Sequence, residues 1–168
     1  IPALAAFPQR AYVIAHRDAV SIPGLRTIVQ MLGAIPVPSD LSGMAPFAEA
    51  LERRAEQGAC IGIYPEAHVW PYYTGVRPFK AASFRYPART SRPVVAMAAT
   101  YRPRRLLFWE LRPAMTVTFS EPMYPDPGLP PRHAQEDLCQ RVYEFLVRET
   151  EKPGNMAYIQ YLPRQEQK

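Results

Sequence analysis

The segment between residues 63 and 80 brings the side chains of a polar binding site into a short length of chain. It contains one carboxylate, one imidazole and two cations, at Glu66, His68, Arg77 and Lys80. A guanidinium fork together with an ammonium suits a dianion such as a phosphate group. These four side chains therefore indicate a binding site for an anionic ligand, with ordinary solvated surface cations as the alternative for Arg77 and Lys80.

An apolar run stands directly before these side chains. Residues 59–64, Ala-Cys-Ile-Gly-Ile-Tyr, have the pattern of a buried strand. Glu66 and His68 would then leave the carboxyl end of that strand, where open α/β sheets bind their ligands. The alternatives are that Glu66 is an exposed carboxylate at a strand end and that His68 is a hydrogen-bonded structural histidine.

The rest of the chain alternates strand and helix patterns. Strand patterns cover residues 11–15, 34–37, 93–98, 106–111 and 114–119, and helix patterns cover residues 22–33, 42–58, 79–90 and 135–152. Arg112-Pro113 leaves too little room between the last two strands, so a hairpin or a bulged edge is expected there. This order predicts an α/β fold with a mixed, mostly parallel central sheet flanked by helices.

Three of the helix patterns carry specific expectations. Ser42 stands where it can cap the second helix, with Met44 and Leu51 on the buried face. Pro87 limits the length of the short third helix. The last helix has its apolar face at Leu138, Val142, Phe145 and Leu146 and ends at Pro153-Gly154.

Length and composition predict one domain. At 168 residues and 48% hydrophobic content, the chain can bury one core, and we expect a single domain over residues 1–168 with residues 155–168 as a C-terminal tail. The net charge of +5 comes mostly from arginine, which leaves phosphorylated metabolites, anionic lipid surfaces and nucleic acid as possible partners. Solvated surface arginines are the alternative.

The positions of the two cysteines argue against a cysteine metal site and against a disulfide framework. Cys60 and Cys139 have neither the spacing of metal ligands nor that of a disulfide framework, which fits a reducing cytosolic compartment. No segment approaches the roughly 20 apolar residues that cross a bilayer. We expect neither a metal nor another cofactor.

With these elements in order, the chain resembles the glycerolipid acyltransferases, the family that contains the 1-acylglycerol-3-phosphate acyltransferases, and most closely a bacterial branch of it. Four consecutive pieces carry the resemblance: Gly33-Ala34-Ile35-Pro36-Val37, Tyr64-Pro65-Glu66-Ala67, Pro78-Phe79-Lys80 with Phe84-Arg85, and Arg92-Pro93-Val94-Val95. They match the family's Gly-x-Ile-x-Val, Pro-Glu-Gly-Thr-Arg, Pro-Phe-Lys-x-Gly-x-Phe and Pro-Val-Val-Pro-Val blocks in order and spacing.

The chain also departs from the family pattern. Pro38 or Ser39 stands where the second block usually has arginine, and Ala67, His68 and Val69 replace the Gly-Thr-Arg of the third block. Phosphate recognition by those two arginines therefore does not carry over to this chain.

The family's catalytic pair, a His followed five positions later by an Asp, is absent from these 168 residues. His16, His68 and His133 are followed at that distance by Ser21, Tyr73 and Leu138. Because residues 1–8 look like the segment that follows the pair in relatives, we expect the pair upstream of Ile1. We therefore expect no catalytic residue in this chain, and we expect the isolated chain to be inactive.

The resemblance implies roles for the remaining site residues. Glu66, Ala67, His68, Arg77 and Lys80 would bind the acceptor, with Arg77 and Lys80 on its phosphate group. Trp70, Tyr72 and Tyr73 would line an acyl groove or lie at the lipid interface, with core packing as the alternative. Arg102, Arg104 and Arg105, close to Trp109, could meet anionic headgroups or belong to a solvated hairpin.

The implied activity is transfer of a fatty acyl group from acyl-CoA or acyl carrier protein to a hydroxyl of a lysophospholipid or glycerol phosphate in phospholipid biosynthesis. The protein would act as a peripheral protein on the cytoplasmic face of an anionic membrane. The alternative is a non-catalytic lipid-binding module with the same fold. A nucleic-acid binder is the weakest hypothesis, because no nucleic-acid motif accompanies the charge.

Overall fold

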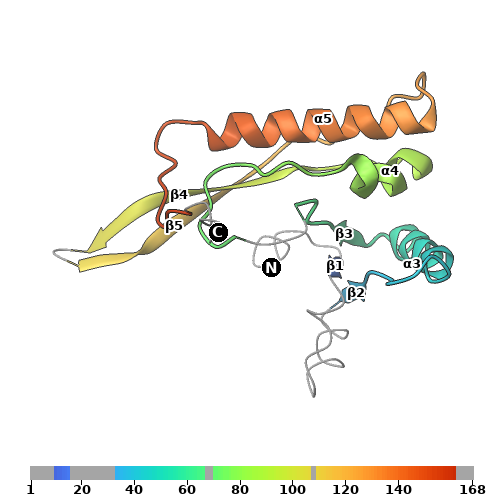
Figure 1. The fold of residues 1–168 in the computed structure, drawn as a ribbon, viewed down its shortest axis with the longest axis horizontal. Coiled ribbons are helices and arrows are strands. Elements are labelled where there is room, and N and C mark those ends of the chain that lie inside the picture. Colours follow the sequence, from blue (N-terminus) through green and yellow to red (C-terminus); the bar gives the residue numbers. More distant parts are fainter. Residues whose placement is uncertain (1–9, 16–32, 67–69, 107–108, 162–168) are drawn as a thin grey trace, which may run out of the picture. The chain divides into compact units, whose positions relative to one another are not determined.

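The computed structural model describes residues 10–15, 33–66, 70–106 and 109–161. The chain forms two compact units, Ile1–Ala67 and His68–Lys168, and each is described below by itself (Figure 1). The single domain expected from the sequence remains a prediction. Residues 22–32 of the predicted first helix and residues 1–9 lie outside the described part.

The first unit contains a parallel sheet of three short strands. These are β1 (Ala11–Ala15), β2 (Ala34–Pro36) and β3 (Cys60–Gly62), in the order β2-β1-β3. Val13 of β1 is opposite Ala34 on one side and Gly62 on the other. The sequence pattern placed all three strands, and the parallel sheet with helices confirms the α/β class.

Gly33 is needed for the pairing of β1 with β2. Its φ is +94°, and a Cβ at this position would lie 2.7 Å from the carbonyl oxygen of Ala11. Its own carbonyl accepts a 2.9 Å hydrogen bond from the Val13 N–H. The backbone geometry therefore explains why the Gly-Ala-Ile-Pro-Val block begins with glycine, since only a residue without a side chain can lie this close to the Ala11 carbonyl.

Helix α3 (Met44–Glu56) connects β2 to β3, and its start corrects two expectations. Ser42 does not cap it; the Asp40 carboxylate accepts hydrogen bonds from the Gly43 N–H at 2.8 Å and from the Ser42 hydroxyl at 2.6 Å. A carboxylate accepts hydrogen bonds from N–H groups more strongly than a hydroxyl does, which explains why Asp40 and not Ser42 binds the N–H at the start of the helix. Met44 is exposed because it lies in the first turn, whereas Leu51 is buried as expected.

The second unit places a long helix, α5 (Pro131–Thr150), along a two-stranded antiparallel sheet of β4 (Met97–Leu106) and β5 (Trp109–Phe119) (Figure 1). A short 3-10 helix, η2 (Ala81–Phe84), and helix α4 (Arg85–Thr90) also contact α5. Pro87 falls in the first turn of α4, where a missing N–H costs little, so it starts this helix instead of ending it. None of the described helices is both long and apolar enough to span a membrane.

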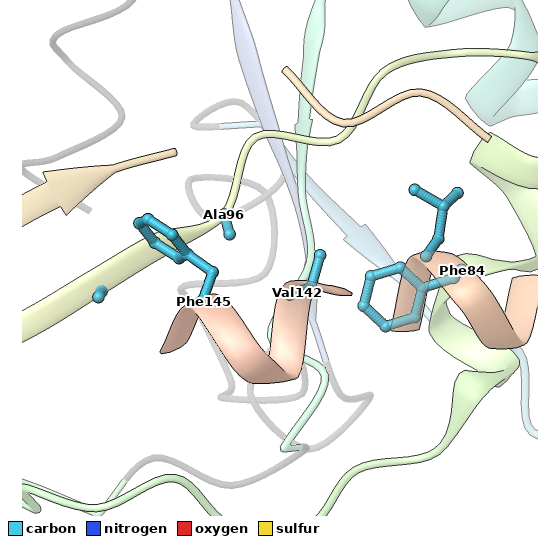
Figure 2. Packing of buried hydrophobic residues seen from close by; sticks show 6 residues of the cluster. Phe84, Ala96, Val142 and Phe145 are labelled. Atoms are coloured by element: carbon cyan, nitrogen blue, oxygen red, sulfur yellow. The ribbon is translucent and has the colours of Figure 1, made fainter. Parts of the chain in front are cut away.

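The core of this unit lies between α5 and its neighbours. Leu138 is fully buried, and it belongs to a cluster with Phe84, Ala96, Ala98, Val142 and Phe145 (Figure 2). Leu146 packs against the same cluster. The apolar face predicted for the last helix is therefore confirmed, since its 3.6-residue period matches the residues that the structure buries.

The predicted strands after residue 93 were wrong in their bounds. Residues 93–96 form no strand; they make one isolated β-bridge, between Val94 and Met123. Strand β4 begins at Met97. Residues 109–119 form one strand instead of two, with a β-bulge opposite Pro103. The basic residues Arg102 and Arg104 belong to β4, because a strand that projects from the core needs no apolar alternation.

We predict that Gly33→Ala lowers the free energy of unfolding by about 2 to 5 kcal/mol, from a left-handed backbone plus a clash with a carbonyl that cannot move away. Gly58→Ala is the matched control, because Gly58 has φ +77° and open space around its Cβ position. It should cost only about 1 to 2 kcal/mol. Urea unfolding followed by circular dichroism measures both, and equal losses would contradict the close approach at Gly33.

Candidate functional site

Glu66 follows β3 past the carboxyl edge of the parallel sheet. Because β1, β2 and β3 run parallel, their carboxyl ends share one edge, and both Val37 and Glu66 lie beyond it. Glu66 is partly buried there. This is the location that the strand pattern indicated, and the acceptor-binding role of Glu66 remains a prediction. Ala67 and His68 lie outside the described residues.

The aromatic side chains that follow the Pro-Glu motif belong to a larger group in the second unit. We call it the aromatic cluster, and it consists of Trp70, Tyr72, Tyr73, Tyr101, Tyr158 and Tyr161. Its members come from the motif, from β4 and from the segment after α5. The sequence prediction therefore found half of the cluster and missed the other half.

Tyr161 covers one side of the motif. Its ring stacks on Trp70, with 4.7 Å between centroids, and meets the edge of Tyr73 at 5.8 Å. Its hydroxyl donates a 2.7 Å hydrogen bond to the Pro71 carbonyl. The first part of the expected C-terminal tail, residues 155–161, therefore contacts the motif through Tyr161.

Arg77 also packs on Trp70, with its guanidinium carbon 4.7 Å from the ring centroid. Such a cation–π contact contributes about 0.5 to 1 kcal/mol at a partly exposed site and fixes the plane of the guanidinium. A guanidinium offers its N–H donors in one plane, the geometry that recognises carboxylate or phosphate. Lys80, in contrast, is exposed at the N-cap of η2.

Tyr72 is held in a strained backbone conformation. Its φ is +59°, and the Tyr73 N–H donates to the Trp70 carbonyl at 3.2 Å, so residues 70–73 form a tight turn whose third position normally takes glycine. The Tyr72 ring lies between Tyr101 and Tyr158, at 5.4 and 5.1 Å. Backbone strain of this kind persists where the surroundings over-determine it, and it concentrates at functional sites.

Asn155 ties residues 155–161 to the rest of the unit. Its side-chain amide donates to the Thr74 carbonyl at 3.0 Å and to the Thr150 carbonyl at 2.7 Å. Its side-chain oxygen accepts from the Tyr101 N–H at 3.0 Å. One amide therefore joins the motif, the end of α5 and β4.

Two titratable groups in this unit are shifted by their surroundings. Burial raises the pKa of Tyr101, and the neighbouring Tyr72 and Tyr161 raise it further. Burial also raises the pKa of the Cys139 thiol. Both groups therefore keep their protons at neutral pH, and Tyr101 contributes a neutral hydroxyl to the cluster. Among the described residues, no group of three or more His, Cys, Asp and Glu side chains could hold a metal ion.

A family model described as acyltransferase matches residues 2–100. The chain belongs to the acyltransferase family. The match includes all four blocks of the sequence resemblance, with Glu66, Arg77 and Lys80, which confirms that resemblance. No curated protein matches the chain at a significant level.

A solved structure shares the fold of this acyltransferase. The chain is similar to the crystal structure of the 1-acyl-sn-glycerophosphate (LPA) acyltransferase PlsC from Thermotoga maritima, with a TM-score of 0.58 and 21% sequence identity. The similarity covers 89% of this chain and 59% of the other, so the chain spans about three fifths of that protein's length.

The family match ends before the residues that complete the aromatic cluster. Tyr101, Asn155, Tyr158 and Tyr161 all lie beyond residue 100, so no family block draws attention to them. The signal available in the sequence was composition: Met-Ala-Tyr-Ile-Gln-Tyr, residues 156–161, holds four large apolar or aromatic side chains.

We predict that Asn155→Ala destabilises the second unit by about 1 to 3 kcal/mol, because it leaves the Tyr101 N–H and two carbonyls without their partner. Asn155→Asp keeps the acceptor and loses the donors, so its effect should be intermediate. In a Trp109→Phe background, the fluorescence of Trp70 should also shift to the red as Tyr161 loosens. Gln160→Ala, an exposed change in the same segment, is the control. Unchanged stability and emission for Asn155→Ala would contradict the anchoring role.

Proposed function

We propose that this chain provides the acceptor-binding part of an acyltransferase in phospholipid biosynthesis. The enzyme moves a fatty acyl group from acyl-CoA or acyl carrier protein to a hydroxyl of a lysophospholipid or glycerol phosphate. The observation that carries the proposal is the family match over residues 2–100, within which the Pro-Glu motif lies just past the carboxyl edge of a parallel sheet. The similarity to an LPA acyltransferase supports the lipid acceptor.

The reaction defines what the residues must do. The acceptor hydroxyl oxygen attacks the thioester carbon, a C–O bond forms, the C–S bond breaks, and the hydroxyl proton passes to a base and then to the departing thiolate. This step needs a base, a group that orients the base, and anchors for the acceptor. In our proposal the base and its orienting group are the His and Asp expected upstream of Ile1, and the 168 residues supply the anchors.

The anchors differ in charge and are assigned accordingly. Glu66 accepts hydrogen bonds from acceptor hydroxyls, which fits a carboxylate at the edge where parallel sheets bind ligands. Arg77, whose guanidinium packs on Trp70 at 4.7 Å, recognises the phosphate group through its planar N–H donors. Lys80 adds an ammonium. The reaction uses no cofactor besides the acyl donor, and the protein works at the cytoplasmic surface of a membrane, where its acceptor resides.

We predict that Glu66→Gln lowers kcat/KM for the acceptor about tenfold to a hundredfold, the range expected for loss of hydrogen bonds to a charged group. The measurement is transfer of labelled acyl groups to lysophosphatidate or glycerol phosphate, with acyl-CoA and acyl carrier protein as alternative donors. It uses a polypeptide that contains these 168 residues together with the upstream pair.

The control for that experiment is Glu49→Gln, which removes an exposed carboxylate from α3 in the same unit. It should leave turnover unchanged, and circular dichroism should show both variants folded. Unchanged turnover in Glu66→Gln would remove Glu66 from the site. Lipid binding without any transfer to either acceptor would favour the non-catalytic module.

A further inference from the structure

The hairpin of β4 and β5 contains a β-bulge that arranges two arginines side by side. Arg102 pairs with Ala114 and Arg104 with Leu111, so Arg112 and Pro113 together face the single residue Pro103. On the regular strand, residues two apart project from the same face. The guanidinium groups of Arg102 and Arg104 therefore leave the sheet on one side, next to the bulge.

A shallow hollow lies between these two side chains. It has a volume of about 430 Å³ and is lined by Arg102, Pro103, Arg104 and Ala114. Proline and alanine form a floor with few hydrogen-bond donors of its own, since Pro103 has no N–H and Ala114 has a methyl side chain. The hollow thus combines a small apolar floor with two cationic walls, and its size suits a headgroup.

Within the described residues, no acidic side chain neutralises the charge of the hollow. In the described part of the chain, neither Arg102 nor Arg104 forms an ion pair or a side-chain hydrogen bond, and both are exposed. The arginines of α5 differ: Arg132 pairs with Glu136 at 3.3 Å, Arg141 with Asp137 at 2.6 Å and Arg148 with Glu149 at 3.8 Å. Exposed arginines of and after α4, Arg85, Arg89 and Arg92, form no ion pair among the described residues either, so what distinguishes the hairpin is that its two arginines share one hollow.

The surroundings of the hollow favour a lipid as the source of that anion. Figure 1 shows the hairpin running past the C-terminal end of α5, so its outer half projects from the helix. Met115 is opposite Tyr101, so it projects from the other face of the hairpin than Arg102, and it is 49% exposed. Met156 and Tyr158 are each 55% exposed, and Met156 lies beside β4, since its N–H donates to the Tyr101 carbonyl at 2.9 Å. A projecting hairpin that carries cations on one face and exposed apolar side chains on the other and along its edge fits a membrane interface, whereas binding of a free phosphate requires only the cations.

We propose that Arg102 and Arg104 form a phosphate-binding hollow that holds the hairpin on the headgroups of an anionic glycerophospholipid surface. Each guanidinium offers a planar pair of N–H donors to a phosphodiester, and the apolar side chains nearby enter the interface. The proposal draws on the proposed function only for the choice of a lipid surface, and its test does not depend on acyl transfer. It concerns other residues than Glu66, Arg77 and Lys80.

The test measures binding of the 168-residue chain to vesicles of equal parts phosphatidylglycerol and phosphatidylcholine. The double variant Arg102→Gln/Arg104→Gln should reduce the partition coefficient about thirtyfold, since each cation near an anionic surface contributes roughly fivefold. The matched control is Arg89→Gln/Arg132→Gln, which removes the same charge from α4 and from the start of α5. Figure 1 shows both of these elements at the end of the unit away from the hairpin, so binding should change little.

Three further measurements distinguish a lipid headgroup from free phosphate and a bidentate arginine contact from simple charge attraction. Arg102→Lys/Arg104→Lys keeps the charge and loses the bidentate fork, so its binding should lie between the wild type and the glutamine variant. Pure phosphatidylcholine vesicles should bind weakly, and inorganic phosphate should not displace the chain from anionic vesicles at matched ionic strength. Equal thermal unfolding of all variants shows that the exposed changes leave the fold intact.

Four outcomes would overturn the proposal. Equal losses of vesicle binding in the hairpin and control variants would mean that net charge alone drives binding. Full binding by the lysine variant would exclude bidentate contact of the guanidinium groups with the phosphate. Displacement by inorganic phosphate would identify a free anion site. Tighter binding to an oligonucleotide, lost in the same glutamine variant, would assign the hollow to nucleic acid.

Discussion

The shared pairing of β1 is the constraint on which the first unit depends. Val13 has a partner on each side, Ala34 in β2 and Gly62 in β3, and both neighbours run parallel to it. Once this double register is fixed, the carboxyl ends of all three strands must lie at one edge. Segments that are far apart in the sequence, after Pro36 and after Gly62, meet there for reasons of hydrogen bonding alone. Glu66 owes its position to this backbone geometry.

The four blocks that resemble the family therefore contain two kinds of residue: those that the backbone requires and those that lie where a ligand can bind. Gly33 belongs to its block because the backbone of β1 approaches to 2.7 Å of where a side chain would begin. Glu66 stands past the carboxyl edge of the sheet, where parallel sheets bind their ligands. The chain also lacks arginine after β2 and in its Pro-Glu motif, and among the described residues of the second unit Arg102 and Arg104 of the hairpin form no ion pair.

The sequence predicted best what depends on local periodicity. The buried face of α5, with Leu138 and Val142, follows from a 3.6-residue repeat, and β1 from a short apolar run. The hairpin was harder, because a projecting strand such as residues 102–106 has no core to impose an alternating pattern. The aromatic cluster could not be predicted for a different reason. Tyr73 and Tyr161 are distant in sequence, and no local pattern predicts that their rings meet.

The outer edge of β4 is covered in two ways. At Tyr101 both backbone groups that point away from β5 are occupied, the N–H by the Asn155 side chain and the carbonyl by the Met156 N–H. Two residues further along, Pro103 has no N–H to offer. A bare strand edge is a template on which another chain can add a strand, and proline or a covering segment blocks such growth. The segment after α5 thus occupies the backbone groups at Tyr101 on which another chain could otherwise add a strand.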